Sequence, residues 1–143
     1  MIKNRASSLI SLILCHIFSV TVILLCFLMP LITSHVFEGT NQVVVMTAYY
    51  VCVPIALLAM YLLSALLRSI RKSQVFIMTN VLRLRLLSWC CGYVTVVSFI
   101  AGLFYFPMMI ISFCALFMCI ILRVVKNVIY AAVEIKKENE LTI

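Results

Sequence analysis

Long runs of apolar residues, separated by short polar segments, make up most of the chain. The first run covers residues 9–33 without a formally charged side chain. A helix of this length rises about 37 Å, more than the roughly 30 Å of bilayer hydrocarbon. Similar runs follow at about 43–67, 86–106 and 108–126. We therefore predict an all-α integral membrane protein with four spans in a single membrane domain, residues 1–143.

The polar segments between the runs decide the predicted orientation. All eleven Lys and Arg lie near the N-terminus, in the segment 68–85 or after residue 122, and the other two connectors contain none. Positive charge marks the cytoplasmic side, which predicts an N-in/C-in protein with a cytoplasmic loop at 68–85. Short connectors join antiparallel neighbours, so we expect an up-down-up-down four-helix bundle. The tail, 127–143, is rich in helix formers and is expected to extend the fourth helix into the cytoplasm.

The start of the chain resembles a signal peptide only superficially. Lys3 and Arg5 precede the first apolar run, but this run exceeds the 7 to 15 residues typical of a signal-peptide core. No clean small-x-small cleavage site follows it. We expect the first span to be retained.

Composition supports a membrane location and limits the ligands expected. The chain is 66% hydrophobic and only 10% charged, far from the balance of soluble domains. Its net charge of +7 would suggest nucleic acid in a soluble protein. Here the basic residues flank apolar runs, so we expect contact with the lipid bilayer and no direct nucleic-acid binding. The seven cysteines lie inside apolar runs without a Cys/His cluster, and no metal or cofactor is expected.

Catalytic parts are missing from the sequence. It contains no GxSxG or HExxH motif and no glycine-rich phosphate loop. No Asp, Glu, Lys or Arg lies deep within a predicted span, which disfavours proton relays and ion-coupled transport. We therefore predict that the protein is not an enzyme.

A few polar residues within the spans are candidates for an intramembrane site. His16 lies in the first span, where it binds a ligand, accepts a proton or forms a hydrogen bond with a neighbouring helix. Thr47, Tyr49 and Tyr50 precede Pro54 in the second span and are candidates for lining a small polar cavity. A proline within a helix also frees a carbonyl that a water, Ser or Thr can satisfy.

Small side chains provide surfaces for close helix packing. Ser88 and Gly92 are four residues apart in the third span. This spacing suits close helix contact either within the chain or between copies in a homo-oligomer.

Two polar segments carry a family resemblance. The segment before the third span contributes Phe76, Asn80, Val81, Arg83, Leu84 and Arg85. The tail contributes Ile135, Lys136, Glu138, Asn139, Leu141 and Thr142. Both resemble a family of small four-span bacterial membrane proteins catalogued as domain of unknown function 2975. The chain departs from that pattern at Ile77 and Met78, which replace usually polar residues and remove the expected helix N-cap.

The resemblance implies a place in the bacterial cytoplasmic membrane but no established activity. Members are often encoded beside a helix-turn-helix regulator of the Cro/C1 type, which implies a membrane anchor or sensor for such a regulator. Arg83, Arg85 and the tail residues named above are then the candidates for docking it. The alternatives are an immunity or resistance protein against a membrane-active peptide, a small transporter component, or a structural subunit of a membrane complex. In these alternatives the same charges serve only to orient the chain.

Overall fold

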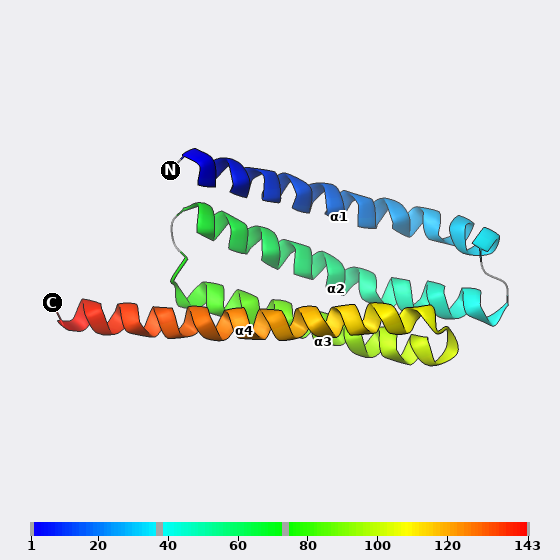
Figure 1. Ribbon diagram of the computed structural model, residues 1–143. Helices are drawn as coiled ribbons and strands as arrows, with labels where there is room; N and C mark the ends of the chain where they lie inside the picture. Colours follow the sequence, from blue (N-terminus) through cyan, green and yellow to red (C-terminus); the bar gives the residue numbers. More distant parts are fainter. Residues whose placement is uncertain (1, 37–38, 73–74, 143) are drawn as a thin grey trace.

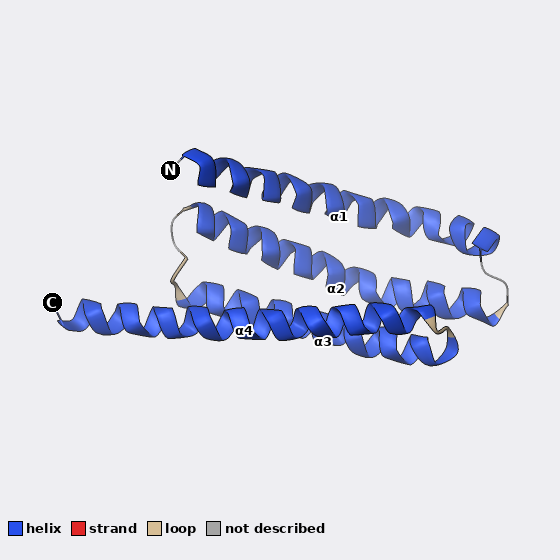
Figure 2. Cartoon of the chain, viewed as in Figure 1, coloured by secondary structure: helices blue, strands red, loops and turns tan. Residues whose placement is uncertain are grey.

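Long α-helices make up the described chain, and Figure 2 shows that loops are confined to the short connections. The computed structural model describes residues 2–36, 39–72 and 75–142, without the side chains of residues 2–8, 36 and 40. Residues 73 and 74 of the predicted loop and residue 143 of the tail therefore lie outside the described residues. The helices are α1 (Ile2–Val36), α2 (Thr40–Arg71), α3 (Met78–Phe104) and α4 (Pro107–Thr142).

The helices begin and end at residues whose backbone conformation is not helical or that lack an N–H group. Gly39, with φ of 60°, precedes α2, and Tyr105 is extended at the end of α3. Pro107 begins α4, a position where the missing N–H group costs no helical hydrogen bond. The segment 68–85, expected as a loop, is mostly helical, because α2 continues through Arg71 and α3 begins at Met78. The basic residues of this segment therefore do not interrupt the helices.

The helices pack in chain order as an open row (Figure 1). Among the described residues, α1 contacts α2, α2 contacts α3, and α3 contacts α4, with no packing between α1 and α4. The predicted up-down-up-down bundle is therefore not closed around one central core. The outer faces of α1 carry exposed apolar side chains such as Ile13, Phe18 and Phe27, which lipid can solvate where no helix covers them.

The tightest packing lies between α3 and its neighbours. Leu62 of α2 and Leu87 and Cys90 of α3 form a buried cluster, against which Leu122 of α4 packs. The Ser112 hydroxyl of α4 donates a hydrogen bond of 3.0 Å to the Thr95 carbonyl of α3. The α3–α4 pair thus forms the firmest part of the row.

Small residues bring α3 and α4 together. Ser88 is 4% exposed, and its hydroxyl donates to the carbonyl of Cys119 over 3.4 Å. A Cβ placed on Gly92 would lie 3.9 Å from the sulfur of Cys119. The Ser88/Gly92 pair therefore serves a contact within the chain.

Each of the four helices is long and apolar enough to cross a membrane. Large apolar side chains face outward along all of them; Phe27 of α1, for example, is 81% exposed and Phe113 of α4 66% exposed. Such a surface is stable in lipid and not in water. The chain is therefore a multi-pass membrane protein. Both termini and the α2–α3 connection lie at the same end of the row (Figure 1), here called the charged end.

Candidate functional site

His16 hydrogen-bonds within its own helix. Its Nδ1 lies 2.9 Å from the carbonyl oxygen of Leu12, one turn earlier in α1. Its exposed ring lines a shallow cavity of about 220 Å³ between α1 and α2, together with Ser19 and Tyr61. No group of three or more His, Cys, Asp or Glu suited to a metal ion occurs among the described residues. His16 is thus a polar group on the wall of the α1–α2 groove.

Tyr49 and Tyr50 connect α2 to α1 through hydrogen bonds. The Tyr49 hydroxyl donates to the Val22 carbonyl over 2.9 Å, and the Tyr50 hydroxyl donates to the Cys26 carbonyl over 3.0 Å. Their rings meet edge to face, with centroids 6.0 Å apart. Both hydroxyls therefore act as interhelical donors.

Thr47 lies apart from that interhelical contact. It lines a wholly apolar cavity of about 270 Å³ between α2 and α3, beside Val51, Val97 and Phe104. Thr47 and Tyr50 also share a shallow cavity near the start of α2. Tyr49 and Tyr50 therefore form hydrogen bonds between α2 and α1, and Thr47 and Tyr50 line cavities beside α2.

At the charged end, Asn80 organises the connection between α2 and α3. Its side chain is 1% exposed. Nδ2 donates to the Val75 carbonyl over 3.0 Å, and Oδ1 accepts from Nη1 of Arg83 over 3.2 Å. The same Nη1 donates to the Ala65 carbonyl of α2 over 3.2 Å. Arg83 is therefore held between two helices, whereas Arg85 is exposed on α3.

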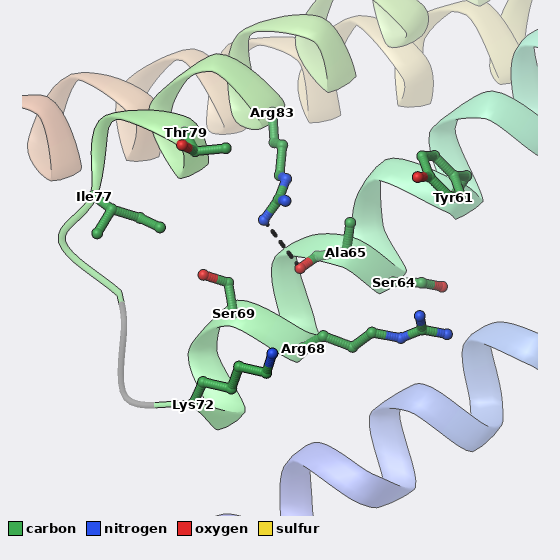
Figure 3. A pocket seen from close by; sticks show the side chains of 9 residues that line it. All are labelled: Tyr61, Ser64, Ala65, Arg68, Ser69, Lys72, Ile77, Thr79 and Arg83. Atoms are coloured by element: carbon green, nitrogen blue, oxygen red, sulfur yellow. Dashed lines mark hydrogen bonds between the residues drawn. The ribbon is translucent and has the colours of Figure 1, made fainter.

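This network borders a cavity of about 450 Å³ (Figure 3), here called the basic cavity. In Figure 3, Arg83 reaches from α3 toward α2, and Arg68 extends from α2 toward α1. The cavity is lined by cations and hydroxyl groups, namely Arg68, Lys72, Arg83, Ser64, Ser69 and Thr79.

The tail residues continue α4 as an exposed helix. Ile135 is 59% exposed and Leu141 80% exposed. Lys136 and Glu140 form an exposed ion pair of 3.7 Å, and the Thr142 hydroxyl donates to the Glu138 carbonyl over 2.8 Å. The candidate docking residues therefore fall into two groups, Arg83 inside the α2–α3 network and the tail residues in the open.

One comparison with known proteins finds a match. The family model described as "Protein of unknown function (DUF2975)" matches residues 6–143, which is nearly the whole chain. The chain belongs to this family. No curated protein and no solved structure matches it.

The structure explains two of the residues that carry the DUF2975 resemblance. Asn80 and Arg83 connect α2, α3 and the segment between them, so both have a structural task irrespective of any partner. The departure at Ile77 has the expected effect, because this N-cap residue makes no side-chain capping hydrogen bond.

Sequence reasoning missed the basic cavity. Arg68 and Lys72 were interpreted as orienting charges, and Asn80 as part of a family pattern only. The available signal was the concentration of basic residues at 68–85 on both sides of a short connection. The pattern does not show that Arg83 of α3 and Arg68 of α2 line the same cavity.

Proposed function

We propose that this protein is a non-enzymatic, N-in/C-in membrane anchor or sensor that holds a cytoplasmic helix-turn-helix regulator on the end of α4. The observation that carries the proposal is that α4 continues as a helix beyond the helix it packs against. It has 36 residues against 27 in α3, a difference of nine, or about 14 Å of additional helix. Figure 1 shows this end projecting past the other helices.

The end of α4, from Val128 onward, has a surface suited to another helix. Val128, Ala132, Ile135, Asn139 and Thr142 follow one another at alternating steps of four and three residues. This is the spacing of a helix–helix contact seam, and a single Asn within a seam selects one register. Val128 and Ile135 are 64% and 59% exposed, so the stripe is uncovered in the described chain. We call these five residues the tail stripe.

Charge distribution supports the cytoplasmic location of the tail. The N-terminus, the α2–α3 connection and the tail lie at one end, and they carry the basic residues of the chain. The positive-inside rule assigns that end to the cytoplasm. A bacterial cytoplasmic membrane and a Cro/C1-type partner follow from the family resemblance.

The experiment is a crosslinking pull-down of the tagged protein from its native membranes, read by mass spectrometry. The intact chain is compared with a truncation that removes 134–143, the part of α4 beyond α3. A second variant, Ile135→Glu, puts a charge into the tail stripe. Its matched control, Tyr130→Glu, introduces the same charge at an exposed residue on another face of the helix, outside the tail stripe and the docking candidates.

We expect the intact chain and the control to recover a DNA-binding regulator. Truncation abolishes recovery, and Ile135→Glu lowers it about tenfold or more, as expected for loss of one buried aliphatic contact. Recovery of only the chain itself or of other membrane subunits contradicts the anchor and favours an oligomer or a complex subunit. Sensitivity to a membrane-active peptide on gene deletion, unchanged by the tail variants, favours an immunity protein.

A further inference from the structure

The basic cavity concentrates positive charge without a counter-charge. Arg68, Lys72 and Arg83 line it, and none of its lining residues is Asp or Glu. The acidic residues among those the structure describes lie on the tail of α4, where Lys136 and Glu140 pair with each other. Arg68 and Lys72 form no side-chain ion pair with a described residue. Such a cavity is suited to an anion.

The chemistry of the lining suits an oxyanion such as a phosphate group. Guanidinium and ammonium groups give charge-assisted hydrogen bonds to phosphate oxygens. Thr79 also lines the cavity, and its hydroxyl adds a neutral donor. Recognition of this kind is directed at a tetrahedral oxyanion and not at an apolar ligand.

The position of Arg83 is fixed before any ligand binds. Asn80, which is 1% exposed, accepts a hydrogen bond of 3.2 Å from Nη1 of Arg83, and the Ala65 carbonyl accepts another of 3.2 Å. A guanidinium group has five N–H donors, so its remaining ones stay available to a ligand. The N-terminus of α3, the positive end of its dipole, lies at the same connection. The C-terminal end of α2 carries about half a negative charge, which opposes anion binding but is smaller than the positive charge of the cations present.

The basic cavity continues into the α1–α2 groove, whose wall combines polar His16 and Ser19 with apolar Leu57 and Met60. The α1–α2 cavity of about 220 Å³ shares Tyr61, Ser64 and Arg68 with the basic cavity and reaches Leu57. Leu57 lies fourteen residues before the end of α2 at Arg71, or about 21 Å along the helix. The path therefore leads from the charged end toward the middle of the hydrocarbon. Leu57 and Met60 in this groove can contact an acyl chain, which a free phosphate ion does not have.

We infer that the basic cavity binds the phosphate of an anionic phospholipid headgroup, with an acyl chain along the α1–α2 groove. This site is independent of the tail stripe and of any regulator. It places a bound lipid between α1 and α2, the neighbouring pair with the least mutual contact in the row. The packing of α1 against α2 then depends on how much anionic lipid the membrane contains.

The test uses the full-length protein, delipidated in detergent, and native mass spectrometry with thermal unfolding. The probes are phosphatidylglycerol, phosphatidylcholine as a lipid with a neutral headgroup, and inorganic phosphate against chloride at equal ionic strength. The variant R68Q/K72Q removes two cations of the cavity. The control R71Q/R85Q removes two exposed cations at the same end that do not line it. Equal helicity and equal unfolding temperature without ligand show that the variants fold.

We expect the wild type and the control to bind phosphatidylglycerol about tenfold or more tightly than phosphatidylcholine. R68Q/K72Q loses this preference. Retention of the preference by R68Q/K72Q, or equal loss in both variants, overturns the site. If inorganic phosphate stabilises the wild type but not R68Q/K72Q, and phosphatidylglycerol adds nothing, the cavity takes free phosphate and the lipid assignment is wrong.

Discussion

The Tyr50 hydroxyl of α2 donates a hydrogen bond of 3.0 Å to the carbonyl oxygen of Cys26 in α1. Cys26 is the residue four positions before Pro30, which lies within α1 and has no N–H group. Its carbonyl therefore lacks the donor that a regular helix supplies. Bulk water is absent from the hydrocarbon, and here the neighbouring helix supplies the donor. Tyr50 completes the α1 backbone and at the same time connects α1 to α2.

We predict that Tyr50→Phe destabilises the protein by about 1 kcal/mol, the usual size of an interhelical hydrogen bond in a membrane. Tyr49→Phe is the matched comparison and should cost less. Its acceptor, the Val22 carbonyl, lies 2.9 Å from the Tyr49 hydroxyl but retains its helical donor, the N–H of Cys26. Thermal unfolding of the two variants in one detergent measures the difference.

A double-mutant cycle with Pro30→Ala isolates the cause. Alanine restores the N–H group that donates to the Cys26 carbonyl, so Tyr50→Phe should cost clearly less in the Pro30→Ala background. An equal cost in both backgrounds would mean that the freed carbonyl is not what Tyr50 stabilises.

The four helices follow from the sequence because each apolar run is long enough to cross the hydrocarbon, and length alone decides that. The partner of the Cys26 carbonyl does not follow. Pro30 predicts a freed acceptor, and Ser, Thr or water was expected as donor, whereas the structure supplies a tyrosine. The choice depends on the register between α1 and α2. Uniformly apolar helices leave that register unspecified in a sequence pattern.

The same limit applies to the candidate site. The accumulation of charge near 68–85 was predictable, but the basic cavity depends on Arg83 of α3 and Arg68 of α2 lining the same hollow. Asn80 makes this arrangement possible through its contacts with Val75 and Arg83. A single polar residue at the start of a helix does not reveal such contacts. The family pattern singled out Asn80 and Arg83 without a reason, and the structure provides one.

Gly102→Ala should loosen the α3–α4 hairpin. A Cβ at this position would lie 2.8 Å from Cγ and 3.0 Å from the backbone nitrogen of Met109. The backbone contact cannot be relieved by a rotamer change, so we expect a loss of about 1–3 kcal/mol in stability. The change is measured by thermal unfolding in detergent.

Gly92→Ala provides the matched control for that substitution. Its Cβ would meet only the sulfur of Cys119, at an ordinary 3.9 Å. Because alanine favours helix over glycine, this variant should be neutral or slightly more stable. Equal destabilisation by both substitutions would show that the close approach at Met109 does not limit packing.

Asn80→Leu should destabilise the α2–α3 connection. The substitution leaves the Val75 carbonyl without the Nδ2 donor and removes the acceptor for Arg83. Loss of a buried polar partner costs about 1–3 kcal/mol. We expect faster proteolysis at this connection in detergent, compared with Thr79→Val, which changes an exposed neighbour in the same turn. Equal proteolysis of the two variants would exclude Asn80 as the residue that holds the connection.

Reporter fusions test the predicted orientation. A green fluorescent protein placed after Thr142 should fluoresce, because it matures on the cytoplasmic side, where the positive-inside rule places the charged end. Alkaline phosphatase fused after Asn41, at the start of α2, should be active, because the α1–α2 connection lies at the opposite end of the row. The exchanged fusions serve as controls and should both be inactive. The reverse pattern would place the tail stripe and the basic cavity outside the cell, where no cytoplasmic regulator reaches the tail, although the lipid site would remain possible in the outer leaflet.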